Sequence, residues 1–302
     1  MNEISRWLLK GDAAIRYMAQ RDLLGADAPT LAALQSQIAF EGFGAAFLSR
    51  QNEDGHWGLH YYQPKWTSTH YTLLDIKNLG MPATQRACVN IVARMFDECM
   101  DESGGLNLAK HEHLSDTCVD GMILSYAAYF CPDDPRLAKL VDHLISAQKD
   151  DGGFTWEYKS ERGDPHTTIC VLEGFGQYSA SGSKYRASDI GDAMAKAVNY
   201  LLANRLFIED SDARFRKLTY PFRYRYDLLR ALDYLASHAI GFDERMRPAL
   251  NWLLSKRDED GRWHLENHHR GSVHFEMEEL NAPSRFITLK ALCILKFYEP
   301  FI

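Results

Sequence analysis

The sequence lacks any block of lysine or arginine, and its formal net charge is -7. This balance argues against a general nucleic-acid binder. No apolar run reaches the roughly 18 residues that a membrane-spanning helix needs, and residues 1–6 lack the apolar core of a signal peptide. We therefore expect a cytoplasmic protein that does not span a membrane.

Close cysteine pairs are also missing. The cysteines are scattered, without Cys-x-x-Cys spacing, at Cys88, Cys99, Cys118, Cys131, Cys170 and Cys293. This pattern excludes a disulfide framework and favours free thiols in a reducing compartment. No segment shows the alternation of a convincing strand either, so an all-α chain is expected.

What the sequence does contain is a repeated turn, in which an apolar helix end is followed by Gln (Arg257 in the last copy), an acidic stretch, Gly and an aromatic residue. The clear copies lie at 48–58, 144–154 and 253–263, with a faded copy at 100–106. Gly55, Gly104, Gly152 and Gly261 are 49, 48 and 109 positions apart, and the last interval is two periods with a worn unit near 201–207. A fixed period of this length predicts a repeat architecture.

Helical spacing of apolar residues fills the segments between these turns. The expected helices cover 7–24, 31–50, 68–79, 84–100, 115–130, 166–178, 226–238 and 284–298, with others ending near 148, 204 and 256. One opening helix and five helix pairs, joined by alternating short and long connections, predict a closed ring of inner and outer helices. The last helix is apolar almost all round, so we expect it to be buried on every side.

The Gln-x-x-x-Gly-x-Trp turns resemble the repeats of the α/α-toroid superfamily, which includes squalene cyclases, class II terpene cyclases and protein prenyltransferase β subunits. Segments 116–122, 166–168, 226–230 and 283–286 support the resemblance, which covers about residues 7–297. It is closest to uncharacterised prenyltransferase-like single-toroid proteins. It implies an all-α toroid of about five to six helix hairpins, as a single domain over 1–302. It also implies an isoprenoid or other apolar substrate.

The resemblance implies a zinc site as well. Protein prenyltransferases hold zinc with Asp-x-Cys at the start of one inner helix and His at the start of the next. Asp116, Cys118 and His166 match these positions, and one repeat period places them at the same end of the ring. An oxygen, a thiolate and an imidazole would leave one open position for an incoming thiolate.

Other interpretations of these residues stay open. Asp116 could simply cap a helix, Cys118 could be a buried apolar residue, and His166 could satisfy a loop carbonyl. Asp120 is a second candidate for the carboxylate ligand, because 119–121 also resembles the Asp-Gly element of the family.

A second group of residues is aromatic and cationic and lies at or just before the starts of inner helices. Within it we expect Trp66, His70, Tyr224 and Phe286 to bind the substrate. Aromatic faces can stabilise a carbocation, and Arg can bind a diphosphate. The alternative is that these aromatic residues are core.

The predicted catalytic residues are Tyr226, Asp227, Arg230 and Arg285. Asp227 and Arg230 are three positions apart on one helix, so they are expected to pair with each other. The His- and Glu-rich segment 264–281 fits no metal template and is expected to be a solvated loop.

Three functional hypotheses follow from the sequence. The leading one is a prenyltransferase-like enzyme that binds its substrate in a central aromatic cavity and is assisted by zinc. A partner subunit is possible. The second is a non-catalytic toroid that binds a lipid or protein partner. The third is a terpene-cyclase-like enzyme. The Asp-x-Asp-Asp proton donor of class II cyclases is absent from the sequence, which disfavours the third.

Overall fold

A computed structural model describes residues 2–109 and 115–301. Over these residues the secondary structure is helical, and strand-like pairing is limited to isolated bridges. The α-helices are α1 (Glu3–Leu9), α2 (Ala13–Met18), α3 (Ala28–Gln37), α4 (Gly42–Leu48), α5 (Thr69–Asn78), α6 (Arg86–Cys99), α7 (Thr117–Phe130), α8 (Leu137–Ser146), α9 (Pro165–Ala180), α10 (Ala187–Ala203), α11 (Leu228–Ser237), α12 (Arg247–Ser255) and α13 (Arg285–Tyr298). Of the helices in this part of the chain, none is long and apolar enough to cross a membrane.

Short segments of tighter or wider helix extend this framework. They are the π-helix η1 (Ala19–Leu24) and the 3-10 helices η2 (Lys65–Thr67), η3 (Arg205–Phe207), η4 (Ala213–Arg216), η5 (Glu244–Met246) and η6 (Glu299–Phe301). The π-helix continues α2 without a break, because Met18 and Ala19 both keep right-handed helical backbone angles.

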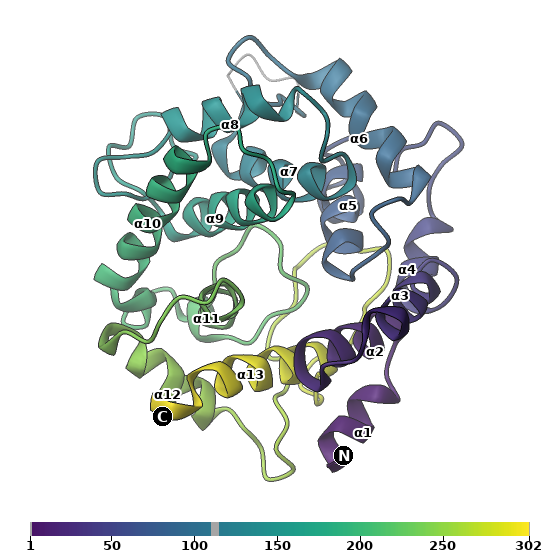
Figure 1. Ribbon diagram of the computed structural model, residues 1–302, viewed down its shortest axis with the longest axis vertical. Helices are drawn as coiled ribbons and strands as arrows, with labels where there is room; N and C mark the ends of the chain where they lie inside the picture. The colour runs from purple at the N-terminus through teal and green to yellow at the C-terminus, as the bar shows by residue number, and fades with distance from the viewer. Residues whose placement is uncertain (1, 110–114, 302) are drawn as a thin grey trace.

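The helices form two layers around a central axis (Figure 1). Helices α5, α7, α9, α11 and α13 surround the centre together with α2, whereas α6, α8, α10 and α12 lie outside them. This arrangement is the all-α toroid expected from the sequence.

The ring closes where α13 meets the start of the chain. The ammonium of Lys290 on α13 lies 2.5 Å from the Asp233 carboxylate on α11. On its other side, α13 reaches the first helices. Lys296 Nζ donates to the Leu23 carbonyl at 3.1 Å, and Arg285 Nε donates to the Trp7 carbonyl at 3.2 Å. Helix α13 therefore links α11 to the first helices of the chain.

The repeated turns share one backbone conformation. Their glycines have φ angles in the left-handed region, at +84°, +90°, +86° and +80° for Gly55, Gly104, Gly152 and Gly261. Glycine adopts this conformation without the steric cost that a Cβ imposes. The weak copy at Gly104 is thus the same turn as the clear ones.

In these turns the Gln side chain reaches a neighbouring outer helix, and the Trp side chain binds the helix that the turn ends. Gln148 Nε2 donates to Gly152 O in its own turn and to Ala193 O on α10, at 2.9 and 2.8 Å. Trp57 and Trp263 are fully buried, and their Nε1 groups donate to carbonyls at the ends of α4 and α12 at 2.7 Å. The turns that contain Gln therefore join the end of one outer helix to the next.

An inner-helix side chain holds the other side of each turn. Threonine hydroxyls accept the backbone N–H of the aromatic residue from Trp57, Phe154 and Trp263 at 2.9–3.0 Å. In the second turn Asp120 takes this place, and its Oδ1 accepts the N–H of Leu106 at 2.9 Å. Asp120 therefore has a structural role equivalent to that of the threonines.

Two expected helices are broken in the structure. The first is interrupted after Leu9, because Asp12 caps a new helix by accepting the N–H of Ala14 at 2.9 Å. The second is interrupted between Gln37 and Gly42. Gly42 adopts φ +66°, and its neighbour Phe43 donates its N–H to Asp12 Oδ2 at 2.8 Å. One carboxylate thus fixes both breaks, a contact that apolar spacing cannot reveal.

The last helix differs from the prediction that it is buried on every side. Phe286, Ile287, Ala291 and Ile294 are buried, but Phe297 is 40% exposed. The exposed side lines the pocket described next, so the apolar residues of this helix serve both the core and a cavity.

Candidate functional site

A pocket of about 810 Å³ lies in the ring, within the range of ligand-binding cavities. Its lining includes the C-terminal parts of the inner helices, at Lys77 on α5, Tyr129 on α7, Gln177 on α9, His238 just after α11 and Phe297 on α13. The connection before α11 and the first turn of α13 add Phe222 and Phe286. The sequence predicts a site at the opposite end, where the inner helices begin.

One wall of the pocket is apolar and partly aromatic. Phe286 is 1% exposed, and its ring stacks on Tyr220 with centroids 4.1 Å apart and planes 12° apart. Phe222 lies beside Lys290, whose ammonium is 5.0 Å from its ring centroid. Leu289 completes the wall from α13. This surface suits an apolar molecule, because burying it removes apolar area from water.

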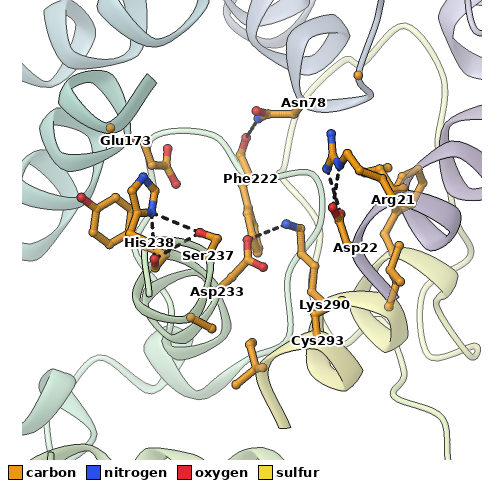
Figure 2. Close-up of a pocket in the computed structure, with 18 of the residues that line it drawn as sticks. Arg21, Asp22, Asn78, Glu173, Phe222, Asp233, Ser237, His238, Lys290 and Cys293 are labelled. Atoms are coloured by element: carbon orange, nitrogen blue, oxygen red, sulfur yellow. Dashed lines mark hydrogen bonds and ion pairs between the residues drawn. The ribbon is translucent and has the colours of Figure 1, made fainter. Parts of the chain in front are cut away.

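The three carboxylates that line the pocket each form an ion pair, and Figure 2 shows the first two of these pairs. The first joins Lys290 and Asp233 at 2.5 Å, and the second joins Arg21 to Asp22 at 2.5 Å. The third joins Glu173, on α9, to the guanidinium of Arg230. Each carboxylate that lines the pocket therefore has a cation as its partner.

The Glu173–Arg230 pair is bidentate. Arg230 Nε and Nη2 donate to the two Glu173 oxygens at 2.8 and 2.6 Å. Burial raises the pKa of Glu173, but the adjacent Arg230 charge outweighs it and holds that pKa below its ordinary value. Glu173 is therefore a carboxylate at neutral pH, unsuited to donating a proton to a substrate.

His238 presents a fixed tautomer at the rim. Its ring stacks on Tyr234 with centroids 4.0 Å apart, and its Nδ1 lies 2.9 Å from the Tyr234 carbonyl. A carbonyl only accepts, so Nδ1 carries the hydrogen, and in the neutral ring Nε2 keeps a lone pair. Figure 2 shows the ring on the same side of the pocket as Glu173.

The four predicted substrate-binding residues are divided by the structure. Phe286 lines the pocket, but Trp66, His70 and Tyr224 are not among the residues that line it. Trp66 stacks on Tyr224 with planes 7° apart and donates its Nε1 hydrogen to the Arg270 carbonyl at 2.7 Å. His70 is fully buried, and burial lowers its pKa to about 3.

Two long connections cover the end of the ring where these aromatic residues lie. Arg223, in the connection before α11, pairs with the buried Asp75 of α5 at 2.7 Å. In the connection before α13, His269 is 5% exposed and bonds the Pro221 carbonyl, and His274 bonds Thr72 at 2.9 Å. His269 and His274 therefore pack this His- and Glu-rich segment against the ring, whereas the side chains of His268 and Glu276 are 40% and 54% exposed, as expected for a solvated loop.

The four predicted catalytic residues have structural contacts. The Tyr226 hydroxyl donates to the Leu206 carbonyl at 2.7 Å. Asp227 caps α11 by accepting the N–H of Arg230 at 2.9 Å, and burial raises its pKa to about 7. Arg285 lies 4.6 Å over the Trp7 ring. None of these four is among the side chains that line the described pocket.

Contrary to the prediction from the sequence, Asp227 does not pair with the side chain of Arg230. Asp227 contacts the backbone N–H of Arg230, while the guanidinium binds Glu173 and the carbonyls of Arg223 and Arg225. The i,i+3 spacing favoured a local pair, but Arg230 is 1% exposed and points toward α9. A capping role for Asp227 leaves the guanidinium free to bind a partner from the neighbouring inner helix.

The three residues predicted to hold zinc each have another partner. Asp116 Oδ1 accepts the N–H of Cys118 at 2.8 Å, so it caps α7. Cys118 Sγ lies 3.7 Å from Cys170 Sγ, and His166 Nδ1 accepts the N–H of Tyr226 at 2.8 Å. Among the residues that the structure describes, no group of three or more His, Cys, Asp or Glu could hold a metal ion. In this structure the three residues are bonded to other groups, and the zinc site stays a prediction.

The zinc prediction itself is decided by metal analysis. Stoichiometric zinc in the purified protein, lost in Cys118→Ser with the helical content unchanged, would support it. Asp116 caps α7 through Oδ1, which leaves its Oδ2 as the oxygen that could bind a metal ion.

Sequence reasoning missed most of the pocket. Lys77, Glu173 and Asp233 lie in the second halves of α5, α9 and α11, and Lys290 lies near the middle of α13. One feature of the sequence could have indicated the pocket. These charged residues lie on the inner helices, which are the more apolar helices of each pair, and a charge there must form an ion pair or line a cavity.

Comparisons with known proteins do not assign a family. No protein-family model matches the chain, and no curated protein matches it. Among solved structures, the chain is similar to the apo form of the type II terpene cyclase MstE from Scytonema. The identity is 14%, the match covers 85% of this chain and 96% of that one, and the TM-score is 0.34. At these values the similarity says nothing about the activity of this chain.

Proposed function

We propose that this chain is a prenyltransferase-like protein whose central pocket binds an isoprenoid or other apolar small molecule. The observation that carries the proposal is the apolar wall of Phe222, Phe286 and Leu289 facing a cavity of about 810 Å³ inside the toroid. The apolar body of the ligand would lie on this wall. Its polar end would meet the charged side chains opposite.

The geometry supports this pocket over the end favoured by the sequence. At the other end, Trp66 and Tyr224 stack on each other, and Trp66 is also hydrogen-bonded to the connection before α13. A ligand there would have to displace packed side chains. In the pocket, the aromatic wall already borders open space.

A terpene-cyclase-like reaction receives less support. Such a reaction needs a carboxylic acid that is protonated at neutral pH and contacts the substrate. Asp227 has a suitably raised pKa of about 7, but it caps α11 and does not line the pocket. The carboxylates that do line it are ion-paired.

We expect Phe222→Ala to weaken binding of a fluorescent isoprenoid analogue by about 10- to 100-fold, the effect of losing most of one aromatic contact. The matched control is Phe215→Ala. Phe215 is 5% exposed and Phe222 8% exposed, but Phe215 packs beside His166 and Tyr226. Fluorescence titration of both variants, with unfolding curves to confirm folding, gives the comparison.

The opposite result would assign the ligand to the other end of the ring. If Phe215→Ala loses binding and Phe222→Ala does not, the ligand lies at the inner-helix N-termini, as the sequence predicts. If the wild-type protein binds no isoprenoid analogue, the proposed function is wrong. Binding without turnover of a prenyl diphosphate would favour the non-catalytic alternative.

A further inference from the structure

One cation in the pocket has no partner. Lys77 is in the last turn of α5 and lines the cavity. Among the described residues, no hydrogen bond or ion pair engages its ammonium group. Its neighbour Asn78 holds the Phe222 carbonyl at 3.5 Å, so this turn of α5 also positions the aromatic wall.

The surroundings of Lys77 explain why it is left without a counter-ion. Glu173 is the carboxylate whose charge raises the pKa of Lys77, but both of its oxygens already bind Arg230. Asp233 is paired with Lys290, and Asp22 with Arg21. The charged groups that act on Lys77 are thus one carboxylate, Glu173, and three cations, Lys290, Arg21 and Arg230.

This environment favours a neutral amine. Burial lowers the pKa of Lys77 to about 8; Glu173 opposes this shift, and the three neighbouring cations add to it. At pH 7.5 roughly a quarter of such a group is neutral, against about one in a thousand for an ordinary lysine. Only the neutral amine is a nucleophile, and desolvation beside other cations is a known way to activate lysine.

We propose that Lys77 is a nucleophilic amine that forms an imine with the carbonyl carbon of an apolar aldehyde or ketone held in the central pocket. The inference rests on the proposed function and names its substrate class. The Nζ lone pair attacks the carbonyl carbon, and the carbonyl oxygen gains a proton as the nitrogen loses one. The resulting carbinolamine then takes a proton from solvent on its hydroxyl, which leaves as water while the C=N bond forms, and the product is a protonated imine. No oxidant or reductant takes part.

The pocket suits this reaction in two ways. The apolar wall holds the body of the molecule and reduces the access of water, which opposes hydrolysis of the imine. A protonated imine carries the same single charge as the ammonium that it replaces. Glu173 therefore stabilises it without any new charge being buried.

The test uses citronellal, a saturated isoprenoid aldehyde, with sodium cyanoborohydride as an added reductant that converts an imine into a stable secondary amine. Peptide mapping by mass spectrometry locates the adduct. At pH 7.5 we expect Lys77 to be labelled roughly tenfold or more in preference to other lysines, because of its larger neutral fraction. Labelling should rise most steeply near pH 8.

Two variants make the result specific. Lys77→Arg keeps the positive charge but cannot form the imine, so labelling at this position should disappear. The control Lys256→Arg changes a partly buried lysine outside the pocket, which pairs with Glu266 at 2.7 Å. That variant should be labelled at Lys77 like the wild type. If Lys77→Arg does not fold, Lys77→Met replaces it.

Citronellol, the matching alcohol, separates the two ideas. If citronellol binds the wild-type protein and Lys77→Arg alike, but citronellal labels lysines without preference for Lys77, the imine is wrong and the binding pocket stands. If neither compound binds, the proposed function itself fails. Preferential labelling of Lys77 that citronellol competes away supports both.

Discussion

Arg230→Ala is expected to lower the free energy of unfolding by about 3–5 kcal/mol, the cost of breaking a buried ion pair by removing one partner. Arg230 is 1% exposed and binds Glu173 through two hydrogen bonds. It also donates to the carbonyls of Arg223 and Arg225. Alanine would leave a carboxylate and two carbonyls without their donor. Chemical denaturation of the variant and the wild type measures the difference.

The control for this prediction is an arginine pair on the surface. Arg245 binds Asp243 at 2.8 Å, with 41% and 32% of the two side chains exposed. Arg245→Ala should cost less than about 1 kcal/mol, as for exposed ion pairs in general. Adding Glu173→Gln to Arg230→Ala should recover part of the lost stability, because it removes the unpaired charge. Equal costs for Arg230→Ala and Arg245→Ala would contradict the buried role.

Trp263→Ala should cost a similar amount, about 3–5 kcal/mol, as for other buried tryptophans replaced by alanine. Its side chain is fully buried, and its Nε1 donates to the Leu253 carbonyl at 2.7 Å. The substitution opens a cavity and leaves a carbonyl at the end of α12 without its donor. The measurement is the shift in the midpoint and free energy of denaturant unfolding.

Trp156 provides the comparison, because it is 56% exposed. Trp156→Ala should change stability by no more than about 0.5 kcal/mol, the usual range for surface positions. A small effect at Trp263 would mean that the repeated turn does not hold the outer helix ends together.

The sequence allowed prediction of the ring because its turns are local. The glycine, glutamine and aromatic positions of each turn lie within about ten residues, so their pattern is visible along the chain. The starts of several inner helices were equally predictable, since Ser284 and Asp116 are capping residues and do cap α13 and α7. Asp120 was misleading because one carboxylate replaced the threonine used in other repeats.

The position of the pocket could not be predicted in the same way. A repeat period places all inner-helix N-termini at one end, but it does not say which end is open. That depends on how the connections before α11 and α13 pack, through contacts such as Arg223 with Asp75. Likewise, Glu173 and Arg230 are 57 positions apart, and no local spacing links them.

The closure of the ring through α13 has a consequence for how the molecule is made. Its contacts with the opening helices join residues 278 and 273 positions apart. During synthesis, α11 and the opening helices lack one neighbour until α13 emerges. Such long-range contacts slow folding and leave apolar surface exposed meanwhile. The nascent chain should therefore expose the surface that α13 covers until residues 285–298 have been synthesised.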